Sequence, residues 1–306
     1  MSGRLGFKSL LRKTLLVWRD VDKVLVNQGE ILSKLNSEKC FSNLSDAGFR
    51  VFSQWEEDGI IQHIVENVEL TDKTFIEFGV ETFEEANCRF LMVKDNWSGF
   101  VIDGSRKNIG KIRSQDIYWK CDLQAECAFI TRDNIEDLLS RSGFGFEPGI
   151  LSVDIDGNDY FVLKQLYSYK PTIIIVEYNG LFGNERAVSV PYDPSFVRTQ
   201  KHFSNVYWGA SLAAFDDVLQ LRGYALVGTN KVGSNAFFVR RDRMSGSLRE
   251  VRPSETTPVV TFREARNERG ELVFADNRQS AAMIAHLPLI DVRSGREIKV
   301  GELELE

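Results

Sequence analysis

TFIEFGVE, residues 74–81, is the stretch that decides the fold of this chain. Residues 74–78 form a short apolar run bounded by polar residues, a pattern typical of a buried strand. Gly79 directly after the run allows a sharp turn or the close approach of a ligand. The acidic Glu77 at that edge can accept hydrogen bonds from an amine or hydroxyl group of a ligand. We therefore predict that residues 74–78 are the first strand of a doubly wound sheet.

Similar apolar runs recur along the chain, separated by segments with the spacing of amphipathic helices. We predict further strands at residues 100–102, 117–119, 150–153, 172–176, 224–227 and 236–239. Alternating strands and helices indicate a mostly parallel sheet with helices on both faces. The last two runs are joined by a turn that contains glycine, which favours an antiparallel pair. The expected fold is therefore α/β: a Rossmann-like, seven-stranded, doubly wound sheet whose last strand is reversed.

The length and composition are those of an ordinary globular protein. The chain has 306 residues, 43% of them hydrophobic and 27% charged, which suits one large domain with appendages. Its net charge of −6 argues against a nucleic-acid partner, because phosphate neutralisation needs a basic face. No apolar run is long enough to span a bilayer. The four cysteines lack the paired spacing of a metal site, so we expect reduced thiols and a cytoplasmic location.

The N-terminal region has a heptad pattern. Leu11, Trp18, Leu25 and Leu32 recur every seven residues, which predicts a helix for self-association into a homo-oligomer or for packing on the body. Its first half is basic, so peripheral contact with an anionic membrane surface is an alternative. We predict three units: this helix in residues 1–40, the α/β domain in residues 41–245 and a small C-terminal appendage in residues 246–306.

Acidic or polar residues follow five predicted strands. Ligands of open parallel sheets bind at the carboxyl ends of the strands, so these residues predict one shared ligand site. Helix capping is the alternative explanation for any single one of them. The residues are Glu77 with Gly79, Asp103, Asp122, Asp154 with Asp156, and Glu177 with Asn179.

The end of the second strand indicates the class of ligand. An acidic residue at the position of Asp103 can bind both hydroxyls of a ribose, as in dinucleotide folds. The glycine-rich phosphate cradle is absent, because acidic residues such as Glu81 follow Gly79 and would repel a pyrophosphate. A nucleoside without phosphates fits better, and S-adenosylmethionine is such a molecule. An NAD(P)-dependent oxidoreductase is the weaker alternative, since it needs the missing cradle.

Over residues 52–240 the chain resembles the FkbM-type methyltransferases, members of the S-adenosylmethionine-dependent class I superfamily. The resemblance rests on Ser53-Gln54 with Glu57-Asp58, and on FIEFGVE, VIDGS, LSVDIDGNDY, IIIVEYNG, GASL and NAFFVRRD. It implies O-methyl transfer to a hydroxyl of a sugar, glycan or natural product. The cofactor-binding residues that it implies are Gln54, Glu77, Gly79, Asn87, Asp103, Ser105 and Asp122. Glu81 and Thr82 stand where related proteins often have a second glycine, so a non-catalytic assembly protein is an alternative.

Methyl transfer to an alcohol also requires loss of the hydroxyl proton, to a general base or with the help of a cation. We predict Asp154, Asp156 and His202 as catalytic residues, His202 being the general base. A surface histidine is the alternative reading of His202. Oxygen ligands at the ends of strands four and five suit Mg²⁺ or another divalent cation, and the predicted set is Asp154, Glu177 and Asn179.

Overall fold

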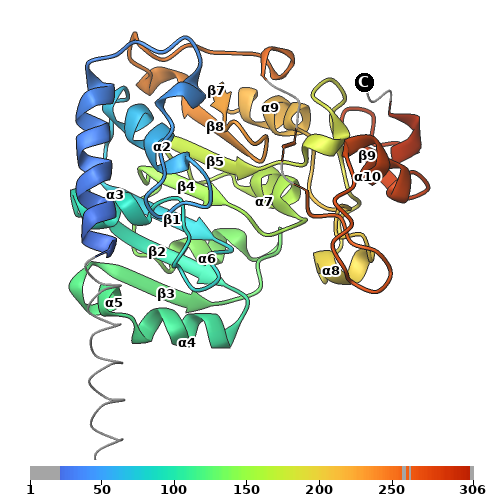
Figure 1. Cartoon of the computed structure of the whole chain (residues 1–306), viewed down its shortest axis with the longest axis horizontal. Helices are drawn as coiled ribbons and strands as arrows, with labels where there is room; N and C mark the ends of the chain where they lie inside the picture. The colour runs from blue at the N-terminus through green and yellow to red at the C-terminus, as the bar shows by residue number, and fades with distance from the viewer. Residues whose placement is uncertain (1–20, 257–259, 262, 304–306) are drawn as a thin grey trace, which may run out of the picture.

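The computed structural model of the chain describes residues 21–256, 260–261 and 263–303. Figure 1 shows a central sheet with helices on both sides and a smaller lobe beside it. The seven strands of the sheet lie in the order β3-β2-β1-β4-β5-β8-β7. They are β1 (Thr74–Phe78), β2 (Ser98–Asp103), β3 (Leu123–Cys127), β4 (Ile150–Val153), β5 (Ile173–Glu177), β7 (Tyr224–Thr229) and β8 (Asn235–Arg240).

The expected α/β fold is confirmed. β1 lies at the centre and pairs in parallel with β2 and β4. β8, the last strand of the sheet along the chain, is antiparallel to β5 and to β7. Because parallel strands point the same way, the carboxyl ends of β1, β2, β4 and β5 meet at one edge of the sheet.

Two hydrophobic cores cover the two faces of the sheet. Alternate residues of β1 divide between them, Phe75 in one core and Ile76 with Phe78 in the other. The Phe75 core contains side chains of α2 (Glu57–Glu66), α3 (Arg89–Asp95), α4 (Arg106–Ser114) and α5 (Asp116–Lys120). The other core contains side chains of α6 (Ile135–Ser140), α7 (Asp159–Gln165) and α9 (Leu212–Gln220).

The predicted strand at residues 117–119 is wrong, because these residues belong to α5 and the third strand begins later, at Leu123. Only Ile117 of that stretch is buried, whereas Trp119 is 73% exposed. Strand propensity here yields to a helical turn that points one side chain into the core. The true strand has the alternation of a half-buried edge strand, with Leu123 and Ala125 inward.

The small lobe combines two segments that are distant in the sequence. We define the lobe as residues 180–209 and 263–303. Its sheet has the order β10-β9-β6, with β6 (Val188–Ser189), β9 (Pro288–Asp291) and β10 (Glu297–Lys299). Its helices are α8 (Arg198–Lys201) and α10 (Asn277–Ile284). Both segments share one hydrophobic core, so the C-terminal appendage packs together with the aperiodic segment that precedes α9 (Figure 1).

Residues 21–37 are helical, in agreement with the predicted N-terminal helix. Leu25, Val26 and Leu32 pack against a cluster formed by Phe49, Val51, Phe52 and Phe90. The earlier part of the heptad pattern, with Leu11 and Trp18, lies outside the described residues. None of the described helices combines the length and the apolar composition needed to cross a bilayer, and the cytoplasmic location stays a prediction.

Asp58, in the first turn of α2, binds the segment of residues 51–53 that precedes the helix. Its Oδ2 accepts hydrogen bonds from the backbone N–H groups of Val51, Phe52 and Ser53 at 2.7–2.8 Å. The Ser53 hydroxyl donates to the same oxygen at 2.8 Å and accepts from the Asp58 N–H at 3.1 Å. Asp58 of the Glu57-Asp58 motif therefore has a structural role, which is to hold residues 51–53 against α2.

Replacing Asp58 with alanine should lower the free energy of unfolding by about 3 kcal/mol or more, because three buried N–H groups lose their acceptor. Urea unfolding followed by circular dichroism measures the change. Glu69, an exposed acidic residue shortly after α2, provides the control. Glu69→Ala should change the free energy of unfolding by no more than about 0.5 kcal/mol. Equal effects of the two substitutions would contradict this role of Asp58.

Candidate functional site

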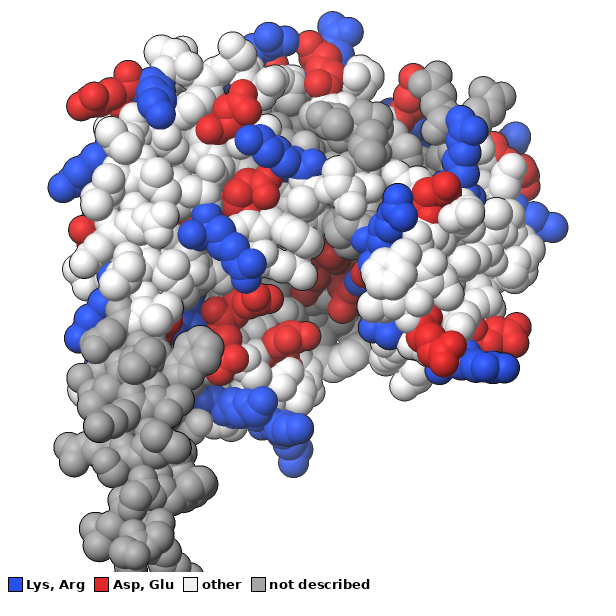
Figure 2. All heavy atoms as spheres, in the orientation of Figure 1, with Lys and Arg blue, Asp and Glu red and all other residues white. Residues whose placement is uncertain are grey.

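A cavity of about 720 Å³ opens at the carboxyl ends of β1, β2, β4 and β5. Its volume lies in the range of small-molecule sites, about 300–1,000 Å³. Figure 2 shows acidic side chains gathered in the hollow between the main body and the lobe. The acidic residues that line the cavity are Glu77, Glu81, Glu85, Asp103, Asp154, Asp156 and Glu177. Gln54, Gly79, Asn87 and Ser105 line it as well, so most of the predicted site residues come together.

Glu77 is held at the end of β1 by the segment that leads into α3. Its carboxylate accepts hydrogen bonds from the N–H groups of Asn87 at 2.7 Å and Cys88 at 3.1 Å. Burial raises the pKa of Glu77 to about 7, and these two hydrogen bonds oppose the rise. The Asn87 amide donates in turn to Ser152 Oγ at 3.1 Å, which ties this segment to β4.

The backbone conformation at residue 79 requires glycine, whether or not a ligand binds there. It has a φ of +68°, and a Cβ at this position would lie 1.7 Å from the carbonyl oxygen of Asp154. No other residue type allows the loops after β1 and β4 to approach so closely. Glu81, two residues later, also has a positive φ, +47°, which costs a non-glycine residue about 1–2 kcal/mol. The loop thus adopts at Glu81 a conformation that glycine prefers.

Asp103 at the end of β2 connects the loop after β1 with the loop after β2. Its Oδ2 accepts from the Glu81 N–H at 2.9 Å, and its Oδ1 accepts from the Ser105 N–H at 2.7 Å. Ser105 caps α4 through a hydrogen bond from the Asn108 N–H at 3.3 Å. The Asn108 amide also donates to Asp103 Oδ1 and lines the cavity, a residue that the sequence analysis missed.

The prediction that Asp122 is a cofactor-binding residue is wrong. Asp122 precedes β3, and its carbonyl accepts from the Gly99 N–H near the start of β2, so it lies at the opposite edge of the sheet. The error follows from placing the third strand too early in the chain. Ala128, Phe129 and Ile130, which come after β3, line the cavity instead. The Phe129 ring is 50% exposed and offers a surface for stacking.

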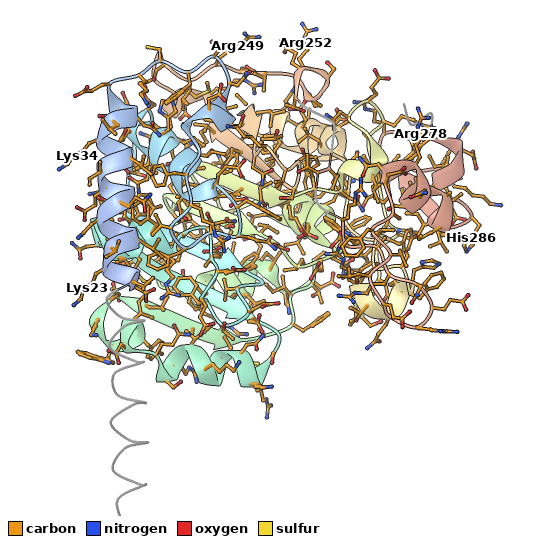
Figure 3. The ribbon with its side chains drawn as sticks, viewed as in Figure 1. Lys23, Lys34, Arg249, Arg252, Arg278 and His286 are labelled. Atoms are coloured by element: carbon orange, nitrogen blue, oxygen red, sulfur yellow. The ribbon has the colours of Figure 1, made fainter. Side chains whose placement is uncertain are left out.

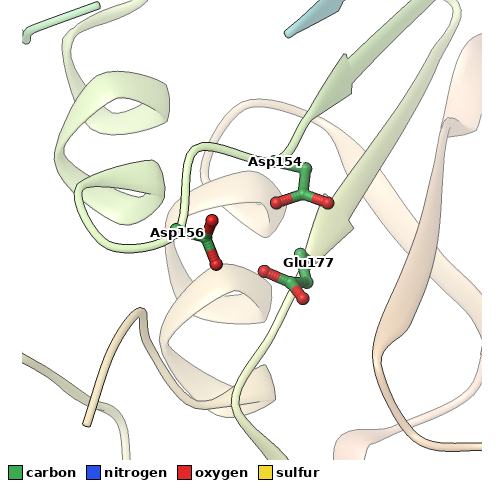
Figure 4. A group of neighbouring side chains, drawn as sticks. All are labelled: Asp154, Asp156 and Glu177. Carbon is green, nitrogen blue, oxygen red and sulfur yellow. The ribbon is translucent and has the colours of Figure 1, made fainter. Parts of the chain in front are cut away.

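An acidic cluster occupies the ends of β4 and β5. Asp154, Asp156 and Glu177 each offer a carboxylate oxygen, and these oxygens lie within 4.8 Å of one another (Figure 4). Burial, and then the charge of neighbouring carboxylates, raises the pKa of Asp154 and of Glu177 well above the ordinary values. Glu177 Oε2 is buried and has no hydrogen-bond partner among the described residues.

The loop after β4 aims Asp156 at the other two carboxylates. Asp156 has a φ of +59°, a conformation in which Asp and Asn are enriched. The buried Asp159 stabilises the loop, because its carboxylate accepts from the N–H groups of Ile155 and Gly157, both at 2.8 Å. Burial raises the pKa of Asp159 to about 6, with these hydrogen bonds acting against it. Asp159 is therefore a structural acid and Asp156 a site residue.

The prediction that Asn179 is a metal ligand is wrong. Its amide donates to the carbonyl oxygens of Val206 at 3.2 Å and Trp208 at 2.9 Å, and its Oδ1 accepts from the Leu181 N–H at 3.0 Å. These hydrogen bonds attach the lobe to the end of β5. They occupy both the nitrogen and the oxygen of the side-chain amide. Asn179 does not line the cavity, and Asp156 takes its place beside Asp154 and Glu177.

His202 is not in the cavity, which removes it as the predicted general base. Its Nδ1 lies 2.7 Å from Ser204 Oγ, and its ring centroid is 6.0 Å from that of His286. Figure 3 labels His286 on the lobe, away from the sheet. Burial and the proximity of His286 lower the pKa of His202. Periodicity could not locate this residue, because the segment around it has none.

Two residues that the sequence analysis did not assign complete the cavity. Arg198 in α8 reaches from the lobe to Asp156, with 2.8 Å between Nη1 and Oδ1. Asn235 lies opposite Glu177 in the β5–β8 ladder, and its amide donates to Glu57 Oε1 at 3.0 Å. The motif residues Glu57 and Asn235 are thus direct partners.

No family model and no curated protein sequence matches the chain. The solved structures similar to it include methyltransferases. An S-adenosylmethionine-dependent methyltransferase from Clostridium acetobutylicum has 10% identity and a TM-score of 0.38, with 62% of this chain and 91% of that chain covered. An O-methyltransferase from Bacillus cereus, in complex with SAH, has 13% identity and a TM-score of 0.36, with 58% and 76% covered. Scores this low carry no argument about the activity of this chain.

The protonation of Glu77 should make stability depend on pH. Its pKa rises from an ordinary 4.5 to about 7 on folding, so the native state binds more protons than the unfolded state between these values. The free energy of unfolding should therefore fall as the pH rises from 5 to 7. Asp58 and Asp159, both with pKa values of about 6, contribute with the same sign.

Urea unfolding at pH 5, 6, 7 and 8 tests this dependence. Glu77→Gln should make the decline between pH 5 and pH 7 shallower, because one proton-binding group is lost. An equally steep decline in the variant would show that Glu77 is ionised throughout this range.

Proposed function

We propose that the protein is an S-adenosylmethionine-dependent methyltransferase. The observation that carries this proposal is the position of Glu77 and Asp103 at the ends of adjacent strands, on one cavity of about 720 Å³. Ligands of doubly wound sheets bind at this edge, and an acidic residue at the end of the second strand suits a ribose. Phe129 on the next loop supports a stacked base.

The cavity suits a cationic nucleoside better than a dinucleotide. Glu81 and Glu85 line it where a pyrophosphate would lie, and their charge disfavours phosphate groups. Arg198 is the only basic residue among the described residues of the lining, and it already pairs with Asp156. The same charge disfavours a nucleic-acid acceptor, since its backbone would be repelled.

We propose that the acceptor group is a hydroxyl of a sugar, glycan or small molecule. In the transfer, the acceptor oxygen forms a bond to the methyl carbon as the carbon–sulfur bond breaks, and S-adenosylhomocysteine leaves as a neutral thioether. The hydroxyl proton goes to a carboxylate of the acidic cluster. The raised pKa values of Asp154 and Glu177 make these carboxylates stronger bases than ordinary ones. Positioning of the two reactants in the cavity supplies much of the acceleration.

The acidic cluster also fits a divalent cation. Three carboxylates converge there, and the unpartnered Glu177 Oε2 offers a free ligand atom. Asp154, Asp156 and Glu177 would hold the ion, which would make the acceptor hydroxyl more acidic.

Asp103→Asn tests the cofactor site. Loss of the charge at the ribose position should weaken binding of S-adenosylhomocysteine at least about tenfold, because hydrogen bonds to charged groups contribute about 1.5–3 kcal/mol. Isothermal titration calorimetry measures the affinity, and a parallel titration with NAD tests the oxidoreductase alternative.

Asp122→Asn is the matched control for this titration. It removes the same charge at the opposite edge of the sheet and should leave the affinity unchanged. Wild-type protein that binds no S-adenosylhomocysteine would favour the non-catalytic assembly protein, and equal affinities of the two variants would overturn the role of Asp103.

We also propose that the protein forms a homo-oligomer through the N-terminal helix. The face of residues 21–37 that points away from the body carries Val21, Val24, Ile31 and Leu35, which are 41–63% exposed. Their spacings of three, seven and four residues fit a heptad seam in which Gln28 occupies one position, and in the sequence the heptad series of Val24 and Ile31 continues back through Val17 to Leu10.

Replacing Val24 and Ile31 together with glutamate should lower the particle mass measured by light scattering to that of a monomer, because charges in the seam repel. Leu221→Glu, at an 89% exposed residue after α9, is the control for adding a negative charge elsewhere. A monomeric wild-type protein, or an oligomer that persists in the double variant, would contradict the proposal.

A further inference from the structure

Arg198 is held in place from several sides. Its Nη1 lies 2.8 Å from Asp156 Oδ1, and its Nη2 forms an ion pair with Glu264 of the C-terminal segment. Its Nε donates to the carbonyl oxygen of Asn205 at 2.9 Å, and the guanidinium lies 4.5 Å from the ring centroid of Trp208. The side chain is only 13% exposed. The Arg198 guanidinium is therefore a preorganised positive charge of the site.

The acidic cluster remains short of positive charge despite Arg198. Asp154 and Glu177 have no cationic side chain within salt-bridge distance among the described residues, and Glu177 Oε2 has no hydrogen-bond partner. Asp154 and Glu177 are partly buried, and charge of one sign that is partly removed from water is costly unless a partner compensates it. The cluster therefore attracts a further cation, while Arg198 already occupies one of its three carboxylates.

We propose that Arg198 gates this cation site, by competing with a divalent cation for the charge of Asp156. The inference rests on the proposed function and concerns the regulation of the same site. A guanidinium beside Asp156 reduces the attraction of the cluster for a second cation, because like charges a few ångströms apart repel strongly where water is partly excluded. Withdrawal of Arg198 leaves all three carboxylates to the ion.

The gate connects cation binding to the lobe. Arg198 belongs to α8 and its ion-pair partner Glu264 belongs to the C-terminal segment, so both residues are part of the lobe. A lobe position that withdraws Arg198 from Asp156 favours the cation, and a bound cation favours that position in return. Acceptor binding at the same edge of the lobe, where Phe196 and Val197 line the cavity, is then coupled to the cation.

Calorimetric titration of the full-length protein with Mn²⁺ alone tests the gate. Arg198→Gln removes the competing charge and should bind Mn²⁺ about 10- to 100-fold more tightly than the wild type, the effect of one unit charge near a partly exposed site. Arg198→Lys keeps the charge and should stay within about threefold of the wild type. Asp156→Asn, which lacks a ligand, should bind more weakly than the wild type. If Arg198→Gln fails to fold, Arg198→Met, whose stem still covers Trp208, replaces it.

Lys201→Gln is the matched control, since Lys201 lies in the same helix but pairs with Asp193 and does not line the cavity. It should leave Mn²⁺ affinity unchanged. The gate is overturned if Arg198→Gln binds no more tightly than the wild type, if Lys201→Gln has the same effect, or if none of the proteins binds Mn²⁺. A separate titration with S-adenosylhomocysteine reports on the proposed function, so either inference can fail without the other.

Discussion

The contact between Gly79 and the backbone of Asp154 is the constraint on which the site depends. A Cβ at residue 79 would lie 1.7 Å from the Asp154 carbonyl oxygen, so the loops after β1 and β4 touch through a glycine. This contact brings Glu77 and Asp103 into the same cavity as the acidic cluster at the ends of β4 and β5. A larger side chain would push the two loops apart, because its Cβ would overlap the Asp154 carbonyl oxygen.

The carboxylates that are buried or partly buried divide into two kinds. Asp58, Glu77 and Asp159 each accept hydrogen bonds from backbone N–H groups, which offset part of the cost of burial and hold a loop in place. Asp154 and Glu177 are different, since Glu177 Oε2 has no donor and the two charges repel each other. The first kind is complete within the fold. The second kind lacks a complete set of partners among the described residues, which is typical of a ligand site.

The lobe contributes to the site although most of it lies far along the chain. β6 and β9 pair across about a hundred residues of sequence, and the common core of the lobe contains Phe196 and Val206, which flank α8. Asn179 fastens the lobe to β5, and Arg198 is the side chain that the lobe places against the acidic cluster. The C-terminal segment, whose sequence shows little chemistry, supplies Glu264 to this arrangement.

The sequence by itself determined the α/β class, the reversed last strand and the edge of the sheet at which Glu77, Asp103, Asp154 and Glu177 meet. These features depend on local periodicity and on the rule that parallel strands end at one edge, so a single sequence contains them. The third strand was misplaced because Ile117 to Trp119 have strand propensity but only one inward side chain. The same misplacement put Asp122 at the wrong end of the third strand and therefore wrongly in the site.

Only the tertiary structure decided which polar residues face the cavity. Asn179 and His202 have suitable chemistry, yet their hydrogen bonds turn them toward the lobe, whereas Arg198, which pairs with Glu264, reaches Asp156 of the acidic cluster. These contacts join segments that are tens of residues apart and have no periodic pattern, so packing and not local propensity sets them.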